Sequence, residues 1–408
     1  MCKYNSLVRF ALANGGVDKQ IMIDNHYLRG IYAAGNPTII FFQDKLYMNL
    51  RLVNYMKLLN SDNAQFLDAK NNPTYFLIDE GVKSRNVFCE LSLDDYHIKL
   101  IKDMKYPIGN NNSYYSGFED CKFIIWDNKL YAYGTRWDKI DNEGHICIYE
   151  LNDHLNPINE IIVKSPFGMQ CEKNWGAIED KPFHFVYRTN ETIIIKVDMF
   201  GDCEVLQRSC VNNKYETSLR GSTPIIRYSP NEYMTLIHRT SQSVLSNGII
   251  ENSYQTAFCF YDNDFNITRI SKWFVFRKNL NEFTCGLSIY KNTLYISYSQ
   301  MDCTAHLLTL PLDKLEEFIN TDKYYPEFDN DYIYDLAKCY EQHEQYRTSY
   351  PLFNYFATLV EDNNDKRKQE AIEKTFTALL TEYKLQNYPE TMQQINKHLQ
   401  SFKDSKII

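Results

Sequence analysis

Residues 117–138, GFEDCKFIIWDNKLYAYGTRWD, decide the fold class, because two apolar runs in this stretch flank a short polar turn. The runs at residues 123–126 and 130–134 have strand character, and Asp-Asn-Lys between them is typical of a tight β-hairpin. Two acids in tandem, Glu119 and Asp120, come just before the first run. The stretch therefore predicts a hairpin that presents an acidic pair where the strand holds side chains rigidly.

The same order of features recurs along the chain: a polar or glycine-rich start, an apolar strand, a polar turn and an aromatic strand. The units start near residues 36, 117, 174, 220 and 284, at irregular spacing. Repeated small sheets of this kind are typical of β-propeller blades. We therefore expect a mainly β fold, a five-bladed β-propeller over residues 1–325, with the polar starts turned toward the central axis. Short alternating runs in residues 1–30 predict strands that open or close a sheet.

The last part of the chain, residues 326–408, has a different pattern and predicts a small α-helical C-terminal domain. Apolar residues at helical spacing predict helices over residues 331–341, 348–360, 368–385 and 389–402. The first two resemble a tetratricopeptide helix pair, with small or aromatic residues at Ala337, Tyr340, Ser349, Phe353 and Phe356. Such a pair either caps the propeller or offers a groove to a protein partner, and both interpretations stay open.

Charge and cysteine content narrow the function classes. The net charge is −8 and there is no basic run, which argues against nucleic acid or an anionic membrane as the partner. The 11 cysteines include no CxxC pair, which indicates buried thiols in a reducing compartment and no metal site. The sequence shows neither a signal-peptide core nor an apolar run of the roughly 18 residues that a membrane span needs. We expect a soluble cytoplasmic protein that uses no metal or other cofactor.

Several charged residues lie at the starts or inner ends of the units and are expected to meet at the axis. They are Arg51, Asp120, Arg136, Lys173, Arg220 and His238. A single acid among cations suits a site that binds an anion beside a bond that needs protonation. The 32 Tyr and 24 Phe residues favour strands and also provide faces on which sugar rings stack.

The order of five short motifs, over about residues 30–312, resembles the five-bladed propeller of glycoside hydrolase family 130 and glycosyltransferase family 108. The motifs are NPTII…YMNLR, FED before a hairpin, KNW, RGSTP…LIHR and FTCGL…ISYS. These families are β-mannoside phosphorylases and β-mannosyltransferases. The resemblance implies that Asp120 is the general acid and reaches the glycosidic oxygen through a sugar hydroxyl. It also implies that Arg51, Lys173 and His238 hold phosphate, with Arg136 as a further candidate.

The expected substrate- and phosphate-binding residues are Asn36, Arg51, Asn54, Glu119, Arg136, Lys173, Asn174, Trp175, Arg220 and His238. Trp175 is expected to provide a platform for a sugar ring. The expected partners are a sugar substrate together with phosphate or a nucleotide sugar. One carboxylate suffices for phosphorolysis, because phosphate is already a nucleophile and needs no general base.

The acidic motif departs from the Glu-Asp-Pro-Arg pattern of these families, because it reads Glu119-Asp120-Cys121-Lys122. The loss of the arginine leaves the sugar open, mannose included. The cations could equally hold the diphosphate of a nucleotide sugar, which would make the enzyme a transferase.

Two other functions stay open. Hydrolysis would need a second acid to activate water, and the available acids, each also interpretable as a turn residue, are Glu179, Asp180, Glu282 and Asp302. The second open function is that of a non-catalytic sugar-binding or scaffold propeller. The replacement of Pro-Arg by Cys121-Lys122 in the acidic motif favours it.

Each candidate side chain also has a structural interpretation. Asp120 could cap the hairpin, Arg51 could pair with a neighbouring acid, His238 could be a core residue and Lys173 a solvated rim charge.

Overall fold

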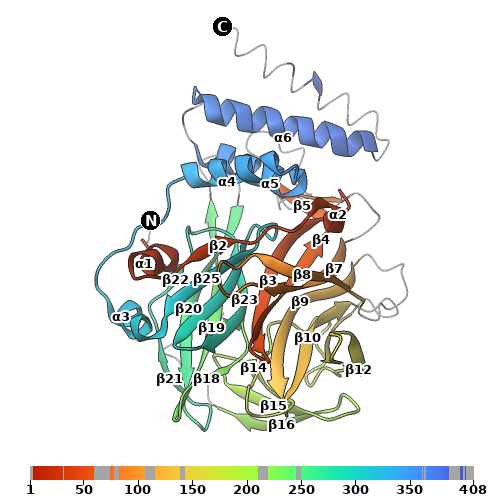
Figure 1. The fold of residues 1–408 in the computed structure, drawn as a ribbon, viewed down its shortest axis with the longest axis vertical. Coiled ribbons are helices and arrows are strands. Elements are labelled where there is room, and N and C mark those ends of the chain that lie inside the picture. The colour runs from red at the N-terminus through yellow and green to blue at the C-terminus, as the bar shows by residue number, and fades with distance from the viewer. Residues whose placement is uncertain are drawn as a thin grey trace.

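The computed structural model of the chain describes residues 3–30, 32–58, 74–77, 82–105, 115–137, 143–209, 219–244, 250–360, 362, 364–385, 396–397 and 400. The described part is mainly β, with its strands in sheets of eight, seven, four, four and two strands. The helices α4 (Asp331–Gln342), α5 (Tyr346–Leu359) and α6 (Lys366–Leu385) form a layer across one end of the strands (Figure 1). The prediction of a mainly β fold with a small helical C-terminal region is confirmed.

The eight-stranded sheet comes first in the chain, and its strand order is β12-β11-β10-β9-β7-β4-β3 with β8 paired to β7. Its strands are β3 (Ala33–Phe42), β4 (Lys45–Val53), β7 (Val82–Leu91), β8 (Ile98–Met104), β9 (Tyr115–Trp126), β10 (Lys129–Trp137), β11 (Gly144–Leu151) and β12 (Pro157–Ile162). Two antiparallel groups make up this sheet, and a short parallel contact between β7 and β9 joins them.

The remaining strands follow in order. One four-stranded sheet contains β13 (Gly176–Ala177), β14 (His184–Arg188), β15 (Ile193–Val197) and β16 (Cys203–Arg208). The seven-stranded sheet contains β1 (Asn5–Ser6), β17 (Arg220–Gly221), β18 (Ile226–Ser229), β19 (Glu232–Val244), β20 (Ile250–Tyr261), β21 (Ile267–Ile270) and β22 (Phe274–Val275). The other four-stranded sheet contains β2 (Asp18–Gln20), β23 (Glu282–Tyr290), β24 (Thr293–Gln300) and β25 (His306–Pro311), and β5 (Tyr55–Leu58) pairs with β6 (Thr74–Leu77).

The hairpin predicted from residues 117–138 is confirmed as β9 and β10. Its turn residues Asp127 and Asn128 have φ angles of 50° and 60°. A two-residue turn with both residues at positive φ is of type I′, and its twist matches that of the paired strands. The turns at residues 43–44, between β3 and β4, and 291–292, between β23 and β24, have the same geometry.

The prediction of strands in residues 1–30 is confirmed in part and wrong in part. Strand β1 pairs in parallel with β22, and β2 pairs with β25, so the segment adds strands to two late sheets. Between them lies helix α1 (Leu7–Ala13), and a second short helix, α2 (Asn25–Leu28), follows β2. Ser6 Oγ caps α1 by accepting a hydrogen bond from the Arg9 backbone N–H at 3.2 Å. The strand prediction is wrong for residues 7–13 because an N-cap serine starts a helix there and its apolar face packs inward.

The C-terminal helices share a hydrophobic cluster with the sheets. Phe353 and Phe356 of α5 pack in one cluster with Tyr55, Val82 and Met301. A buried phenylalanine contributes about 1.5–3 kcal/mol through the apolar surface it removes from water. Because Tyr55 and Val82 also face the cavity described below, α5 supports one wall of that cavity.

The helices predicted over residues 331–341, 348–360 and 368–385 are confirmed as α4, α5 and α6. The helix predicted over residues 389–402 lies almost entirely outside the described residues. Helix α3 (Leu315–Asn320), preceded by a 3₁₀ turn at Leu312–Lys314, was not predicted and packs against the sheets. Within the described ranges, no helix combines the length and apolar character that crossing a membrane requires.

Candidate active site

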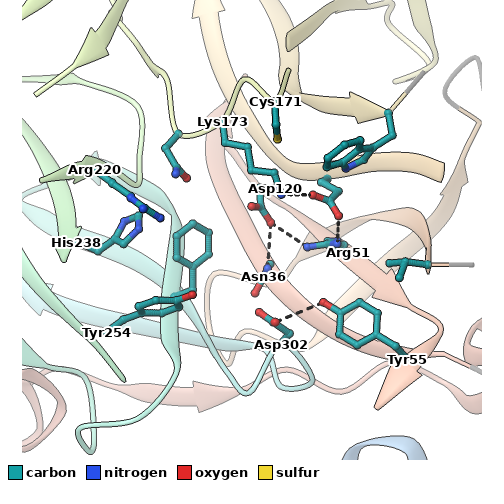
Figure 2. Close-up of a pocket in the computed structure, with 15 residues that line it drawn as sticks. Asn36, Arg51, Tyr55, Asp120, Cys171, Lys173, Arg220, His238, Tyr254 and Asp302 are labelled. Atoms are coloured by element: carbon teal, nitrogen blue, oxygen red, sulfur yellow. Dashed lines mark hydrogen bonds and ion pairs between the residues drawn. The ribbon is translucent and has the colours of Figure 1, made fainter. Parts of the chain in front are cut away.

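A cavity of about 440 Å³ lies where strands from different sheets approach one another (Figure 2). Its lining residues are Asn36, Arg51, Tyr55, Val82, Glu119, Asp120, Trp137, Cys171, Lys173, Asn174, Arg220, His238, Tyr254, Phe283 and Asp302. They come from β3, β4, β5, β7, β9, β10, β17, β19, β20 and β23 and from the segments before β13 and after β24. The starts of the sequence units therefore meet around a single space, as expected from the hairpin pattern.

Irregular pairing turns Asp120 toward the cavity. In the β9–β10 ladder, Glu119 pairs with Thr135 and Lys122 pairs with Tyr133, so two residues of β9 oppose Gly134 alone. Asp120, within this bulge, has a φ of 48°, in the left-handed region. A Cβ on Gly134 would lie 2.5 Å from the Glu119 carbonyl oxygen, so the bulge requires glycine there. Bulges re-aim side chains, and they are frequent beside active sites.

Asn36 reaches the cavity by the same means. The β3–β4 register shifts between Gly35 and Thr38, and Asn36 has a φ of 40°. Its amide Nδ2 donates a hydrogen bond to Asp120 Oδ1 at 3.0 Å. Its Oδ1 accepts one from Ser299 Oγ at 2.5 Å, which fixes the orientation of the amide.

Arg51 connects the two acids of the tandem pair. Its Nη1 lies 3.1 Å from Asp120 Oδ1 and its Nη2 lies 2.7 Å from Glu119 Oε1, while Nε donates to Ser84 Oγ at 2.9 Å. Lys173 Nζ donates to the other oxygen of Glu119 at 2.8 Å, and it lies 5.4 Å from the centre of the Trp137 ring. Glu119 is thus held by two cations, whereas the second oxygen of Asp120 has no hydrogen-bond partner among the described residues.

The cations set the charge of Asp120. Burial opposes its ionisation, but Arg51, Lys173 and Lys122 outweigh burial and hold the pKa of Asp120 below its usual range. The pKa of Glu119 is also lowered, because Arg51 and Lys173 outweigh its burial. In the free protein at neutral pH, both carboxylates are therefore ionised.

Lys122 occupies the position of the arginine in the Glu-Asp-Pro-Arg pattern that the acidic motif resembles. Its side chain is 2% exposed, and its Nζ donates to the Asp120 carbonyl oxygen at 3.4 Å. Its Nζ also lies 5.8 Å from the centre of the Tyr133 ring. Lys122 therefore places a positive charge behind the acid, although its side chain does not line the cavity.

His238 lies in the cavity wall as a neutral ring. It is 4% exposed, and its Nδ1 lies 2.7 Å from Ser222 Oγ. Burial, followed by the nearby Arg220 and Lys122 charges, lowers the pKa of His238 to about 3. The imidazole can hydrogen-bond to a phosphate oxygen but does not contribute a positive charge at neutral pH.

The expectation of one acid among several cations is wrong. Three carboxylates line the cavity, those of Glu119, Asp120 and Asp302, against the cations Arg51, Lys173 and Arg220. Asp302 follows β24, has a φ of 58°, and accepts a hydrogen bond from the Tyr55 hydroxyl at 3.4 Å. Arg220 is exposed, and its guanidinium has no hydrogen-bond or ion-pair partner among the described residues. Arg220 is therefore the cation most available to an anionic ligand.

Three of the predicted binding residues do not line this cavity. Asn54 is fully buried, and its Oδ1 accepts the Lys83 backbone N–H at 2.7 Å. Arg136 forms an ion pair with Glu160, which comes from β12. Trp175 is 1% exposed and donates its indole N–H to Glu172 at 3.2 Å, so its faces are covered.

The cavity also contains residues that the sequence analysis did not predict: Tyr55, Val82, Trp137, Cys171, Tyr254 and Phe283. Tyr55 and Trp137 directly follow the predicted Asn54 and Arg136, and Phe283 directly precedes the unit start at residue 284. Tyr254 comes from the middle of β20, an outer strand whose inward face the sequence does not mark.

The other acids considered as hydrolytic bases lie elsewhere. Glu179 and Asp180 interact with Arg227, through its backbone N–H and its guanidinium respectively. Glu282 is buried and accepts hydrogen bonds from the backbone N–H groups of Phe276 and Arg277 at 2.7 and 3.0 Å. Asp302 is therefore the acid of this set that reaches the cavity. Within the described part of the chain, no group of three His, Cys, Asp or Glu side chains could hold a metal ion.

Comparisons with known proteins find similar solved structures at low sequence identity. No protein-family profile matches the chain, and no curated protein sequence does. A β-1,2-mannobiose phosphorylase from Listeria innocua is 12% identical over 78% of this chain and 99% of its own, with a TM-score of 0.49. A mannose phosphorylase from Leishmania mexicana is 10% identical over 76% of this chain and 93% of its own, with a TM-score of 0.46.

A GDP-Man-dependent mannosyltransferase from the same organism is 9% identical over 76% of this chain and 94% of its own, with a TM-score of 0.43.

Proposed function

We propose that this chain is a carbohydrate-active enzyme that transfers a glycosyl unit, with mannosyl as the first expectation, between a phosphate-linked donor and an acceptor hydroxyl. The observation that carries the proposal is the placement of Asp120. Asn36 and Arg51 hold one oxygen of this ionised acid, in a cavity that also contains Lys173 and the Arg220 guanidinium, which no described residue pairs with. Glycosyl transfer to or from phosphate requires an acid or base beside a group that binds the anion.

In the synthetic direction, Asp120 acts as the base. It takes the proton of the acceptor hydroxyl, directly or through a sugar hydroxyl, while the acceptor oxygen forms a bond to the anomeric carbon. The bond from that carbon to the phosphate oxygen breaks, and its electron pair leaves with the phosphate beside Lys173 and Arg220. Attack opposite the leaving group inverts the anomeric configuration. The lowered pKa of Asp120 keeps it in the ionised form that this direction needs.

In the reverse direction, Asp120 acts as the general acid. Phosphate attacks the anomeric carbon, and Asp120 gives its proton to the departing sugar oxygen. An anion bound beside Lys173 and Arg220 offsets their positive charge, which raises the pKa of Asp120 toward its usual range. The protonated acid is thereby favoured once phosphate is bound. His238 adds a neutral hydrogen bond to the same anion.

Hydrolysis is the second candidate reaction, because Asp302 places another carboxylate in the cavity. An inverting hydrolase needs such a group to activate water on the face opposite the leaving oxygen. Whether the reaction rate depends on added phosphate distinguishes hydrolysis from transfer to phosphate.

The architecture that we propose is a five-bladed propeller over residues 1–325 with a helical domain over residues 326–408. Contacts between the first and last sheets support circular closure: Ser299 Oγ donates to Asn36 Oδ1, and Thr38 Oγ1 donates to the Cys285 carbonyl oxygen at 3.2 Å. Strand β2 completes the last sheet with a segment from the N-terminus, which also joins the two ends of the ring. The nine described cysteines are free thiols, which supports a reducing, cytoplasmic setting. Binding of a protein partner by the tetratricopeptide-like helices stays part of the proposal.

The variant Asp120→Asn tests the proposed function. Asparagine tolerates the left-handed backbone at this position, so the fold is expected to persist. Loss of the acid–base group is expected to lower turnover by about 10²–10⁴-fold, measured with mannose 1-phosphate or a nucleotide sugar as donor and mannose as acceptor. The matched control is Asp127→Asn at the exposed turn of the same hairpin, which is expected to keep full activity. Full activity of the Asp120 variant would remove the mechanism.

A further inference from the structure

The end of strand β24 contacts the eight-stranded sheet beside Asp120. Ser299 is fully buried, and its Oγ donates a hydrogen bond to Asn36 Oδ1 at 2.5 Å. Asn36 uses the other end of its amide, Nδ2, to donate to Asp120 Oδ1 at 3.0 Å. Because the oxygen of an amide accepts hydrogen bonds and its nitrogen donates them, Ser299 decides which end faces the acid. The serine thereby keeps an N–H group against the carboxylate.

A tight turn over residues 300–303 follows β24 and packs against the backbone beside Asn36. Its closing hydrogen bond runs from the backbone N–H of residue 303 to the carbonyl oxygen of residue 300, at 3.1 Å. A Cβ on Gly35 would lie 2.2 Å from the Asp302 carbonyl oxygen, so only glycine lets the turn approach this closely. In Figure 2, Asn36 lies between Asp120 and Asp302. The turn therefore sets the position of the backbone from which Asn36 reaches the acid.

The helical layer holds this turn in a strained conformation. Met301 and Asp302 have φ angles of 56° and 58°. Aspartate tolerates the left-handed region, whereas a bulky residue such as methionine adopts it only where its surroundings impose it. Met301 is 2% exposed and belongs to the same hydrophobic cluster as Leu336 of α4 and Phe353 of α5. The packing of the helices is therefore part of what keeps the turn in place.

A hydrogen bond also links this strand end directly to α4. Gln300 is 1% exposed, and its Nε2 donates to the Tyr332 hydroxyl at 2.6 Å and to Glu282 Oε1 at 2.8 Å. Both hydrogens of the amide nitrogen are thus used, one of them toward the helical layer. Because Gln300 directly follows Ser299 along β24, a shift of α4 relative to the sheets would move the residue that orients Asn36.

We infer that the C-terminal helical layer is a positioning element of the candidate active site: α4 and α5 hold residues 299–303, and these residues hold Asn36 so that its amide N–H meets Asp120. This inference rests on the proposed function, in which Asp120 is the acid–base group. Ser299 and Tyr332 are positioning residues, because each acts on Asp120 through other residues. The amide N–H stabilises the ionised carboxylate, so loosening either contact raises the pKa of Asp120.

The pKa of Asp120 tests the inference, measured in the full chain by NMR titration with ¹³C-labelled aspartate carboxyl groups. The Asp120 signal is the one that is absent from the Asp120→Asn variant. Ser299→Ala is expected to raise this pKa by about one unit, because the amide is free to turn its N–H away from the charged acid. The acidic limb of the pH–rate profile for synthesis is expected to move to higher pH by the same amount, because synthesis needs ionised Asp120.

The other ionisable groups around Asp120 are kept in these variants, so they do not account for a shift. They are Arg51, Glu119, Lys122, Lys173, Arg220, His238 and Asp302.

Ser297→Ala is the matched control for the serine. Ser297 is also fully buried on β24, and its Oγ donates to the Pro37 carbonyl oxygen at 2.5 Å. The control removes an equivalent hydrogen bond between the same two sheets but leaves the contact between Ser299 and Asn36 in place. It is expected to lower stability about as much as Ser299→Ala and to leave the pKa of Asp120 unchanged. A purely structural role for Ser299 predicts the same pKa in both variants.

Tyr332→Phe tests the contribution of the helical layer. Loss of the hydroxyl releases Gln300 from α4 and is expected to raise the pKa of Asp120 by about half a unit. Tyr334→Phe is the control in the same helix, because that hydroxyl donates to Glu370 of α6, and it is expected to leave the pKa unchanged. In the Ser299→Ala background, Tyr332→Phe is expected to add no further shift, because both changes act through Asn36.

Two results would overturn the inference: a pKa of Asp120 that Ser299→Ala leaves in place or lowers, or a shift with Tyr332→Phe no larger than that with Tyr334→Phe. If the variants shift the pKa as expected but no donor supports transfer that requires Asp120, the positioning stands and the proposed function is wrong. If transfer requires Asp120 but the variants leave its pKa in place, the proposed function stands and the positioning by the helical layer is wrong.

Discussion

Two groups of buried acids in this molecule differ in almost every respect other than burial. Asp120 faces a cavity, and cations lower its pKa despite its burial. Glu282 is 1% exposed in the last sheet, and burial raises its pKa to about 8. The contrast shows that a buried carboxylate by itself does not mark a site. What distinguishes Asp120 is an ionised form stabilised by cations, an oxygen left for a ligand and a space in front of it.

The group around Glu282 has the features of a structural connection. Glu282 Oε1 accepts a hydrogen bond from Gln300 Nε2 at 2.8 Å, and the same nitrogen donates to the Tyr332 hydroxyl of α4 at 2.6 Å. Nearby, Asp18 Oδ2 accepts hydrogen bonds from Arg277 Nε and the Tyr298 hydroxyl, each at 3.0 Å. These contacts join the N-terminal strand, the last sheet and the helical layer.

The largest effect on stability is expected from Asp18→Asn. This change leaves the largely buried Arg277, 17% exposed, without its carboxylate, and breaking a buried ion pair on one side destabilises by about 3–5 kcal/mol. Chemical denaturation should show this loss, while turnover per folded molecule stays unchanged because neither residue lines the cavity. Asp322→Asn, whose carboxylate is 97% exposed, serves as the control and is expected to have no effect. A loss below about 1 kcal/mol, or lower turnover in the folded fraction, would contradict the structural role.

A smaller effect is expected from Lys122→Met, and it should appear in the pH dependence. Lys122 is one of the cations that lower the pKa of Asp120, so removing its charge raises that pKa. Synthesis needs ionised Asp120, and its rate falls as pH drops through this pKa. The acidic limb of the pH–rate profile should therefore move to higher pH, by about one unit.

Lys122→Arg keeps the charge, so its profile should match that of the natural chain. If the methionine variant leaves the acidic limb in place, or moves it to lower pH, Lys122 does not tune Asp120. Methionine is close to lysine in volume, so the loss of stability at neutral pH should be about the 1.4 kcal/mol that one pKa unit of Asp120 represents.

The sequence predicts the hairpins well because their turns are local: Asp and Asn tolerate positive φ, and Asp127 and Asn128 adopt it. It also predicts that Asp120, Lys173 and Arg220 share one space, because each starts a unit. The prediction that Arg136 lines the site is wrong. Arg136 pairs with Glu160 on another strand, and that contact forms only in the folded sheet. Trp175 fails for a similar reason, since the contact with Glu172 that buries its indole forms only in the folded chain.

Residues 7–13 show that alternation of apolar and polar residues in a short segment does not distinguish a strand from a helix. The segment LVRFALA fits a short strand or about two turns of helix, and the serine cap decides in favour of the helix. The position of Asp302 shows the same limit for the site. Its approach to the cavity depends on where the turn after β24 meets Tyr55, and no short pattern in the sequence encodes that contact.

The smallest effect is expected from Asp302→Asn, which separates transfer to phosphate from hydrolysis. Asparagine suits the φ of 58° at this position, so the variant changes the charge and little else. If phosphate or a phosphate-linked donor reacts, no second base is needed, and losing one hydrogen bond should alter turnover by less than about tenfold. If the enzyme hydrolyses its substrate, Asp302 is the base in reach, and turnover should fall by about 10²–10⁴-fold without any dependence on phosphate. Measuring the rate with and without phosphate, for both forms, therefore decides whether Asp120 works alone or as one of a pair.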